Sequence, residues 1–331
     1  MWTTLVSHAD SVRNSQHVLF RGKHMTSAQL LAAVAFISAT ALGMSTAPTE
    51  LCEGFLPANT MRIPVGTNET NSSEFAAKRT RKKAPVGSLT EAQFNEVMDR
   101  IEKFYTPVVA KAGGKLTVNR LWKDATENAS AQQMGNSWVI NMYGGLARHP
   151  QVTVEGMALV ACHEMGHHLG GAPKVSGWFG DDWATNEGGS DYYATMKCLR
   201  EYFAEDDNAA VIKVTKIDAT ATKLCKAQWN TPDEIALCQR ISLAGSSVAY
   251  LFQDLSKEKT KPEFDTPDKA VVTEMDDAHP ATQCRMDTYL AGLSCTVDKS
   301  VPVSDTDYKE GSCVEGTHDV GFRPRCWFFA E

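Results

Sequence analysis

Apolar residues recur at helical spacing from residue 88 onward, and this predicts where the folded part of the chain begins. The run from Ser88 to Glu91 has the capping-box pattern that starts many helices. Gly113 and Gly114 predict the end of this first helix. Between these limits, one helical face is apolar at Phe94, Val97, Met98, Ile101 and Tyr105.

Two strands are expected next, because the pattern changes from helical spacing to alternation. Residues 115–122 alternate between apolar and polar side chains, and residues 138–143 form a second strand pattern. The polar residues 124–133 between them are expected to form a loop. A small sheet is therefore predicted before the next helix.

A second helix is predicted over 153–169, and its composition indicates that it is buried. Thr153 is a suitable N-cap, and the run from Gly170 to Pro173 is a strong stop signal. Further helical patterns follow at 212–224 and 235–255. The expected fold class is α+β and predominantly helical, with a small N-terminal sheet packed on the 153–169 helix. Apolar positions recur along that helix at Val154, Met157, Ala158, Ala161 and Met165.

The N-terminal part of the chain does not have the pattern of a folded domain. Residues 1–47 are expected to be a signal peptide, because the basic Arg21 and Lys23 precede an apolar run at 30–42 that is too short to span a membrane. An anchoring or amphipathic helix is the alternative. Residues 48–87 are rich in Thr, Asn, Ser, Ala and Pro and predict a disordered linker or a pro-segment. The basic run at 78–83 is either a processing site or, as we favour, part of a solvated linker.

Length and charge limit the classes of function. A chain of 331 residues with 43% hydrophobic residues can bury a good-sized core over 88–293, followed by a cysteine-rich extension over 294–331. The formal net charge is −7, so no basic excess indicates a nucleic-acid partner. We expect no stable membrane span in the mature chain.

The buried helix carries an H-E-x-x-H motif from His163 to His167. Residues four apart in a helix share a face, so the two histidines can bind one Zn²⁺. Glu164 then projects toward the open position of the metal, where a carboxylate can act as general base. The alternative, two surface histidines on a solvated helix, is disfavoured by the apolar neighbours, because a buried helix needs partners for its polar groups.

Two acidic residues complete the candidate site. Glu187 and Asp191 are again four apart and lie on one face of another predicted helix. Glu187 can supply the third ligand of a His₂Glu site that holds one zinc ion per chain. Asp191 can accept the second ring N–H of a ligand histidine and so fix its orientation.

This arrangement resembles the gluzincin zinc peptidases, since Glu187 follows His167 by 20 positions (187 − 167). The surrounding sequence is most similar to the soluble branch of the HtpX and CAAX-prenyl-protease family. In that family an edge strand followed by Gly-Leu leads into the H-E-x-x-H helix, as residues 137–146 do here. The resemblance covers roughly residues 137–293. No transmembrane helix is recognised in this sequence, so the membrane substrates of that family are not carried over.

The resemblance implies a zincin-like fold and a zinc metallopeptidase domain over 88–293. It also implies hydrolysis of polypeptides by metal-activated water, with the strand at 138–143 pairing with the extended substrate. Finally, the family has a His-Pro segment and a downstream arginine near the zinc, which His279 and Arg285 resemble. His279 is then expected to donate to the developing oxyanion or to bind zinc as a fourth ligand in a resting state. The alternative is a helix-capping His279 and an Arg285 paired with surface acids.

The chain has nine cysteines, and their number helps to predict the cellular compartment of the protein. Cys162 lies within the buried helix and is expected to remain a free thiol. With an export signal, the other cysteines predict at least two disulfides and a periplasmic or secreted location. A reduced cytosolic set is the alternative. The preferred pairs, which enclose short loops, are Cys225–Cys238, Cys284–Cys295 and Cys313–Cys326.

The leading hypothesis is therefore an exported zinc-dependent endopeptidase with Glu164 as general base. The alternative is a zinc-stabilised envelope protein that acts in binding, assembly or quality control with little proteolysis. A third hypothesis is a latent zymogen, silenced by a fourth ligand or by the pro-segment. The presence of Glu164 favours an enzyme, because a structural zinc site has no need of a carboxylate at that position.

Overall fold

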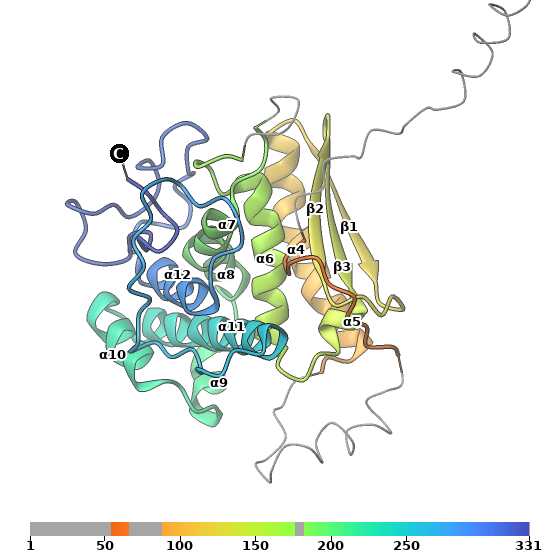
Figure 1. Ribbon diagram of the computed structural model, residues 1–331, viewed down its shortest axis with the longest axis horizontal. Helices are drawn as coiled ribbons and strands as arrows, with labels where there is room; N and C mark the ends of the chain where they lie inside the picture. Colours follow the sequence, from red (N-terminus) through yellow and green to blue (C-terminus); the bar gives the residue numbers. More distant parts are fainter. Residues whose placement is uncertain (1–53, 66–87, 176–181, 331) are drawn as a thin grey trace, which may run out of the picture. The chain divides into compact units, whose positions relative to one another are not determined.

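The computed structural model describes residues 54–65, 88–175 and 182–330, which are drawn in colour in Figure 1. The expected signal peptide over 1–47 and the basic run at 78–83 lie outside these residues. Within the described part, the fold combines helices with a three-stranded sheet. The predicted α+β class is confirmed at this level.

The sheet has the strand order β1-β3-β2, with β1 at Lys115–Leu121, β2 at Ala129–Met134 and β3 at Ser137–Tyr143. β3 pairs with β1 in parallel and with β2 antiparallel. The strand expected at the edge, residues 138–143, is therefore the central strand, and much of the loop expected over 124–133 is the edge strand β2. β2 has small and polar residues, so it lacks the apolar alternation by which a strand is recognised.

The first helix, α4 at Glu91–Lys111, is capped as the sequence suggested but by different residues. Thr90 is the N-cap; its side chain accepts from the N–H of Gln93, and the Gln93 side chain accepts from the N–H of Thr90. The capping box is thus formed by Thr90 and Gln93, two residues later than the expected Ser88 and Glu91. The predicted apolar face of α4 is buried and packs on β1 and on the motif-bearing helix.

Helix α6, at Val154–Leu169, lies at the centre of the described domain (Figure 1). Thr153 caps it as predicted, with its side chain accepting from the N–H of Gly156 at 3.1 Å. The sheet and α4 pack on one side of α6, and α7 (Glu187–Tyr193) and α11 (Pro232–Ser256) pack on the other. Enclosure by these elements shields the H-E-x-x-H motif from bulk water.

The remaining helices connect and cover these elements. A short α5 joins β3 to the segment before α6, and a π-helical turn, η1, continues α7 directly into α8. A π-helical turn inside a helix is frequent near functional sites. The bounds are Gly144–Ala147 for α5, Ala194–Cys198 for η1, Leu199–Tyr202 for α8, Asn208–Val214 for α9, Ala219–Gln228 for α10 and Thr282–Ser294 for α12.

Helix α11 is long and apolar enough to cross a bilayer by length and composition. However, 72% of its most apolar window is buried within the domain, against α6 and α12. Its apolar surface is therefore explained by packing in the core, as for the central helix of many domains.

Four disulfides join cysteines of the described domain, which confirms the expectation of at least two. The expected pair Cys225–Cys238 is confirmed. The expected pairs Cys284–Cys295 and Cys313–Cys326 are wrong, and Cys162 is not a free thiol. Cys52 lies outside the described residues. The bonds formed are Cys162–Cys198, Cys225–Cys238, Cys284–Cys326 and Cys295–Cys313.

Helix α12 explains why the short-loop pairing fails. Cys284 lies in its first turn and Cys295 directly follows its last residue. At 1.5 Å per residue, this separation along the axis is roughly 16 Å, whereas a disulfide needs Cα atoms within about 7 Å. Each cysteine instead bonds to the C-terminal extension, so two disulfides fix the extension to the two ends of α12.

Residues Gly54–Val65, called here the 54–65 segment, belong to the stretch expected to be a linker or pro-segment. They lie against the start of β2, where the N–H of Phe55 donates to the carbonyl of Ala129 at 2.9 Å. The side chain of Asn128 binds both the N–H and the carbonyl of Leu56, at 2.9 and 3.1 Å. Both Phe55 and Leu56 are fully buried. The segment is therefore part of the packed domain.

Glu127, which lies beside the 54–65 segment, is a buried carboxyl group. It is 3% exposed, and its Oε2 has no hydrogen-bond partner among the described residues. Burial raises the pKa of Glu127 from 4.5 to about 7, although Arg62 opposes the shift. Because the pKa is higher in the folded than in the unfolded chain, protonation of Glu127 favours the folded state. This contribution to the free energy of unfolding is fully present below pH 4.5 and is lost as the pH rises through about 7.

We therefore expect Glu127→Gln to be more stable than the wild type by about 1–3 kcal/mol at pH 8. At pH 4, where the wild-type side chain is also neutral, the two proteins should have similar free energies of unfolding. Denaturant unfolding at both pH values measures this difference. The same difference at pH 4 and pH 8 would show that ionisation of Glu127 is not its cause.

Candidate metal centre

Helices α6 and α7 bring two histidines and a glutamate to one point. The rings of His163 and His167, one turn apart on α6, are perpendicular with centroids 4.7 Å apart. Glu187 begins α7; its Oε2 lies 3.3 Å from Nε2 of His163, and its Oε1 lies 3.6 Å from Nε2 of His167. All three side chains are buried, and their ligand atoms lie within 4.8 Å of one another. The predicted ligand set is therefore assembled and could hold a metal ion.

Hydrogen bonds on the far side of each ring direct Nε2 toward this point. His163 Nδ1 lies 2.7 Å from a carboxylate oxygen of Asp191, and His167 Nδ1 lies 2.8 Å from the carbonyl of Thr185. A carbonyl only accepts, so Nδ1 of His167 carries the proton and its Nε2 has a lone pair. Both Nε2 atoms, and Oε2 of Glu187, are buried without a hydrogen-bond partner in the described part of the chain. A bound cation would satisfy all three atoms, so the residues fit a metal ion.

A close approach of the two helices makes this geometry possible. Gly166 lies between the histidines, and a Cβ at this position would come within 2.8 Å of the backbone oxygen of Ser190 on α7. A side chain there would therefore push α7 away from α6. The hydroxyl oxygen of Ser190 also lies 3.1 Å from Nδ1 of His167. Glycine inside the motif therefore permits the close packing of α6 against α7.

Asp191 lies behind His163, as predicted, and is itself held by a buried network. Arg285 on α12 donates to both oxygens of Asp191, at 2.7 and 2.8 Å, and Tyr289 lies 3.2 Å away. Asp191 and Arg285 are both 0% exposed. Burial disfavours the charged form of Arg285, but Asp191 outweighs this effect and raises its pKa above the ordinary value. Arg285 therefore positions the carboxylate that orients a ligand histidine.

Asp191→Asn is expected to weaken zinc affinity roughly 10–100-fold, the usual effect of losing the partner of a ligand histidine. The amide retains the shape of the side chain but removes the charge that holds the imidazole. Competition with a chelator of known affinity measures the change. Asp206→Asn is the matched control, because Asp206 also pairs with two arginines, Arg100 and Arg240, but outside the metal centre. Wild-type affinity in Asp191→Asn would remove this residue from the site.

Glu164 differs from Glu187 in its surroundings. It is 0% exposed, and neither carboxylate oxygen has a hydrogen-bond partner among the described residues. Burial raises the pKa of Glu164 to about 8. For Glu187, burial acts in the same direction, but the nearby histidines outweigh it and lower the pKa to about 2. The two carboxyl groups thus have pKa values shifted in opposite directions. This suits Glu187 as an anionic ligand and Glu164 as a proton carrier.

His279 also reaches the site, from the loop before α12. Its Nε2 lies 3.4 Å from Oε2 of Glu187 and 2.9 Å from the carbonyl oxygen of Gly54. Because that oxygen only accepts, Nε2 donates in this contact. The structure thus brings both His279 and Arg285 beside the metal ligands, where the sequence placed them. His279 contacts Glu187 and the 54–65 segment, whereas Arg285 holds Asp191 and also donates to the carbonyl of Phe55.

His168 is excluded as a ligand by its contacts. Its ring stacks between Trp138 and Trp183, with centroid distances of 5.2 and 5.0 Å. Three other contributors were not recognised in the sequence: Tyr289, the carbonyl of Thr185 and Phe55. Tyr289 follows Arg285 by one helical turn, which is a usable signal. Phe55 stands with Leu56 as an apolar pair in a polar stretch.

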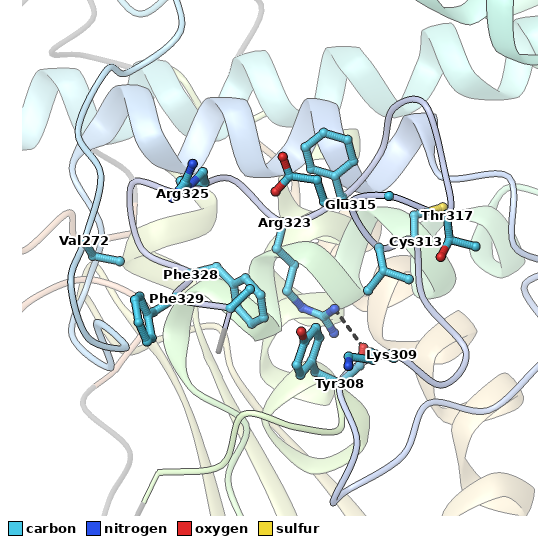
Figure 2. A pocket seen from close by; sticks show the side chains of 14 residues that line it. Val272, Tyr308, Lys309, Cys313, Glu315, Thr317, Arg323, Arg325, Phe328 and Phe329 are labelled. Carbon is cyan, nitrogen blue, oxygen red and sulfur yellow. Dashed lines mark hydrogen bonds between the residues drawn. The ribbon is translucent and has the colours of Figure 1, made fainter.

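A cavity of about 520 Å³ lies among the loops of the C-terminal extension (Figure 2). Figure 2 shows Arg323 beside Tyr308 and Phe328, and its guanidinium donates to the carbonyl of Tyr308 at 3.0 Å. No histidine is found among the described residues that line this cavity. Another cluster, Asp268 with Cys284 and Cys326, cannot bind metal through thiolates because the two cysteines are bonded to each other. The α6–α7 centre is therefore the candidate functional site.

Comparison of the chain with protein-family models, with curated proteins and with solved structures found no match. The chemistry of the site follows from its residues. They provide two imidazole nitrogens, one ionised carboxylate and a second carboxyl group beside them.

Proposed function

We propose that this protein is a zinc-dependent endopeptidase. The observation that carries the proposal is the convergence of His163, His167 and Glu187, with Nε2 of both histidines directed at one point and without other partners. Two imidazoles and one carboxylate are the ligand set of several catalytic zinc sites. Glu164 on the same helix adds a carboxyl group that no described residue binds.

A zinc ion held by these ligands would supply a Lewis acid that lowers the pKa of a water molecule and polarises a peptide carbonyl. Glu164 would accept the proton of the attacking water and donate it to the leaving amine. His279 would donate a hydrogen bond to the carbonyl oxygen as negative charge develops on it. Its present contact with a peptide carbonyl, that of Gly54, supports this role. Arg285 would act indirectly, by holding Asp191 against His163.

The substrate would bind as an extended chain along the edge of β2. In the described part of the chain, β3 is paired with a strand on both sides, whereas β2 is an edge strand of the sheet. The start of β2 already hydrogen-bonds another part of the chain, since the N–H of Phe55 donates to the carbonyl of Ala129. Pairing through the backbone accepts many side-chain sequences, as expected for an endopeptidase. The four disulfides are compatible with an oxidising, exported compartment, and we propose that the enzyme acts there.

A second candidate is the zinc-stabilised envelope protein with little proteolysis. The observation that favours it is the complete burial of the site, in which His163 and Glu164 are 0% exposed and Glu187 is 5% exposed. Structural zinc sites are closed in this way, whereas catalytic sites keep an open position. The unpartnered carboxyl group of Glu164 remains better explained by catalysis, because an unused buried carboxyl group destabilises the fold.

The test is cleavage of an unfolded, reduced and alkylated protein by the purified chain. Cleavage should stop when a chelator removes the metal and return when one equivalent of zinc is added. Mass spectrometry of the products should identify internal peptide bonds. A chain that holds one zinc ion but cleaves nothing, also in the variants described below that open the site, would favour the second candidate.

A further inference from the structure

The 54–65 segment lies over the candidate metal centre. The ring of Phe55 meets the ring of His163 edge to face, with centroids 4.9 Å apart. On its other sides, Phe55 contacts Phe252 at 5.3 Å and lies under the guanidinium of Arg285 at 4.7 Å. The Phe55 side chain is 0% exposed. It therefore fills an aromatic pocket directly beside a metal ligand.

The backbone of the segment binds His279 and the edge of β2, which a substrate would use, and also Arg285. The carbonyl of Gly54 accepts from Nε2 of His279 at 2.9 Å, and the carbonyl of Phe55 accepts from Nη1 of Arg285 at 3.1 Å. The N–H of Phe55 pairs with the carbonyl of Ala129 at the β2 edge. The successive peptide groups of Gly54 and Phe55 are thus bound by side chains of the site and by the edge of β2. Backbone hydrogen bonding to a sheet edge is one way in which proteins bind polypeptides.

The rest of the segment fixes this position. Arg62 and Thr126 form an antiparallel bridge, and the carbonyl of Ile63 accepts from Nε of Arg148 at 2.8 Å. Along the segment, Leu56, which Asn128 binds through two hydrogen bonds, lies between these residues and Phe55. A substrate could not pair with the same edge while these bonds are formed.

We propose that the 54–65 segment is an intramolecular inhibitor that occupies the substrate cleft, so that the described form of the chain is latent. This inference rests on the proposed endopeptidase function and adds its regulation. It also accounts for the burial of a site that retains a catalytic set of residues. Release of the segment exposes the zinc ligands, and the pocket vacated by Phe55 receives an aromatic side chain of the substrate.

The test measures access to zinc separately from cleavage. The zinc-loaded full chain is mixed with excess 4-(2-pyridylazo)resorcinol, and the rate of zinc transfer to this chromogenic chelator is recorded. Phe55→Ala should release zinc roughly 10–100-fold faster than the wild type, because loss of a buried aromatic ring favours the open form. Asn128→Ala should release it about tenfold faster, because two hydrogen bonds to the segment are lost. Cleavage of the unfolded protein substrate should rise in both variants.

Phe94→Ala is the matched control, because Phe94 is equally buried but lies on α4, against Trp122. It should lower stability without changing the rate of zinc release. If Phe94→Ala releases zinc as fast as Phe55→Ala, general loss of stability explains the effect and the inference is overturned. If Phe55→Ala does not fold, Asn128→Ala, which removes no apolar core, decides the question.

The remaining outcomes separate the two proposals. Wild-type release rates in both Phe55→Ala and Asn128→Ala would overturn the inhibitory role alone. Faster release without cleavage by any of the proteins would reject the endopeptidase and leave the segment as the cover of a zinc site. Failure of every protein to retain zinc would reject both proposals.

Discussion

Glu164→Gln is expected to remove cleavage activity and to leave zinc bound. The amide has the shape of the carboxyl group but cannot take a proton from water or pass it to the leaving amine. Loss of a general acid–base typically lowers kcat by about 10²–10⁴-fold. Glu164 is not among the three ligand side chains, so one zinc ion per chain should remain. The measurements are steady-state kinetics on an unfolded protein substrate and metal analysis of the same sample.

Stability distinguishes this result from misfolding. Both oxygens of Glu164 are buried without a partner, so the neutral amide should leave the protein at least as stable as the wild type at neutral pH. Glu155→Gln is the matched control, since Glu155 lies on the same helix and pairs with Arg240 away from the site. Its kcat should be unchanged. Full activity in Glu164→Gln would remove Glu164 from the mechanism.

The candidate metal ligands could be predicted to lie close together because the relation between them is mostly local. The helical repeat alone places His163 beside His167 and Glu187 on the same face as Asp191. Caps are local as well, and Thr153 was identified from its position before an apolar run. The partners of the site come from far along the chain: His279 meets the carbonyl of Gly54 across 225 residues. No periodicity in the sequence encodes such a contact.

The wrong predictions also concern features that depend on contacts between distant parts of the chain. β2 was missed because its stability comes from pairing with β3, and its small, polar residues do not alternate. The disulfides were assigned by loop length, whereas the rigid length of α12 decides which cysteines can meet. The 54–65 segment has a composition typical of a linker, and only Phe55 and Leu56 indicate that part of it is buried. In each case the tertiary environment outweighs the local signal.

Loss of the ion pair between Arg285 and Asp191 is the second change with a large expected effect. Arg285→Leu should lower the free energy of unfolding by about 3–5 kcal/mol, because it leaves the carboxylate of Asp191 buried without its counter-ion. Both side chains are 0% exposed, so water cannot replace the guanidinium. The guanidinium also lies over the Phe252 ring at 4.0 Å, a contact that leucine retains only in part.

Denaturant unfolding in the presence of a chelator measures this loss without a contribution from zinc binding. The double variant Asp191→Asn with Arg285→Leu should recover about 1–3 kcal/mol of it, since no buried charge then lacks a partner. Arg240→Leu is the comparison, because Arg240 is 8% exposed and its acidic partners keep some access to water; its loss should be smaller. A decrease of less than about 1 kcal/mol in Arg285→Leu, with no recovery in the double variant, would show that Asp191 does not depend on Arg285 for its charge.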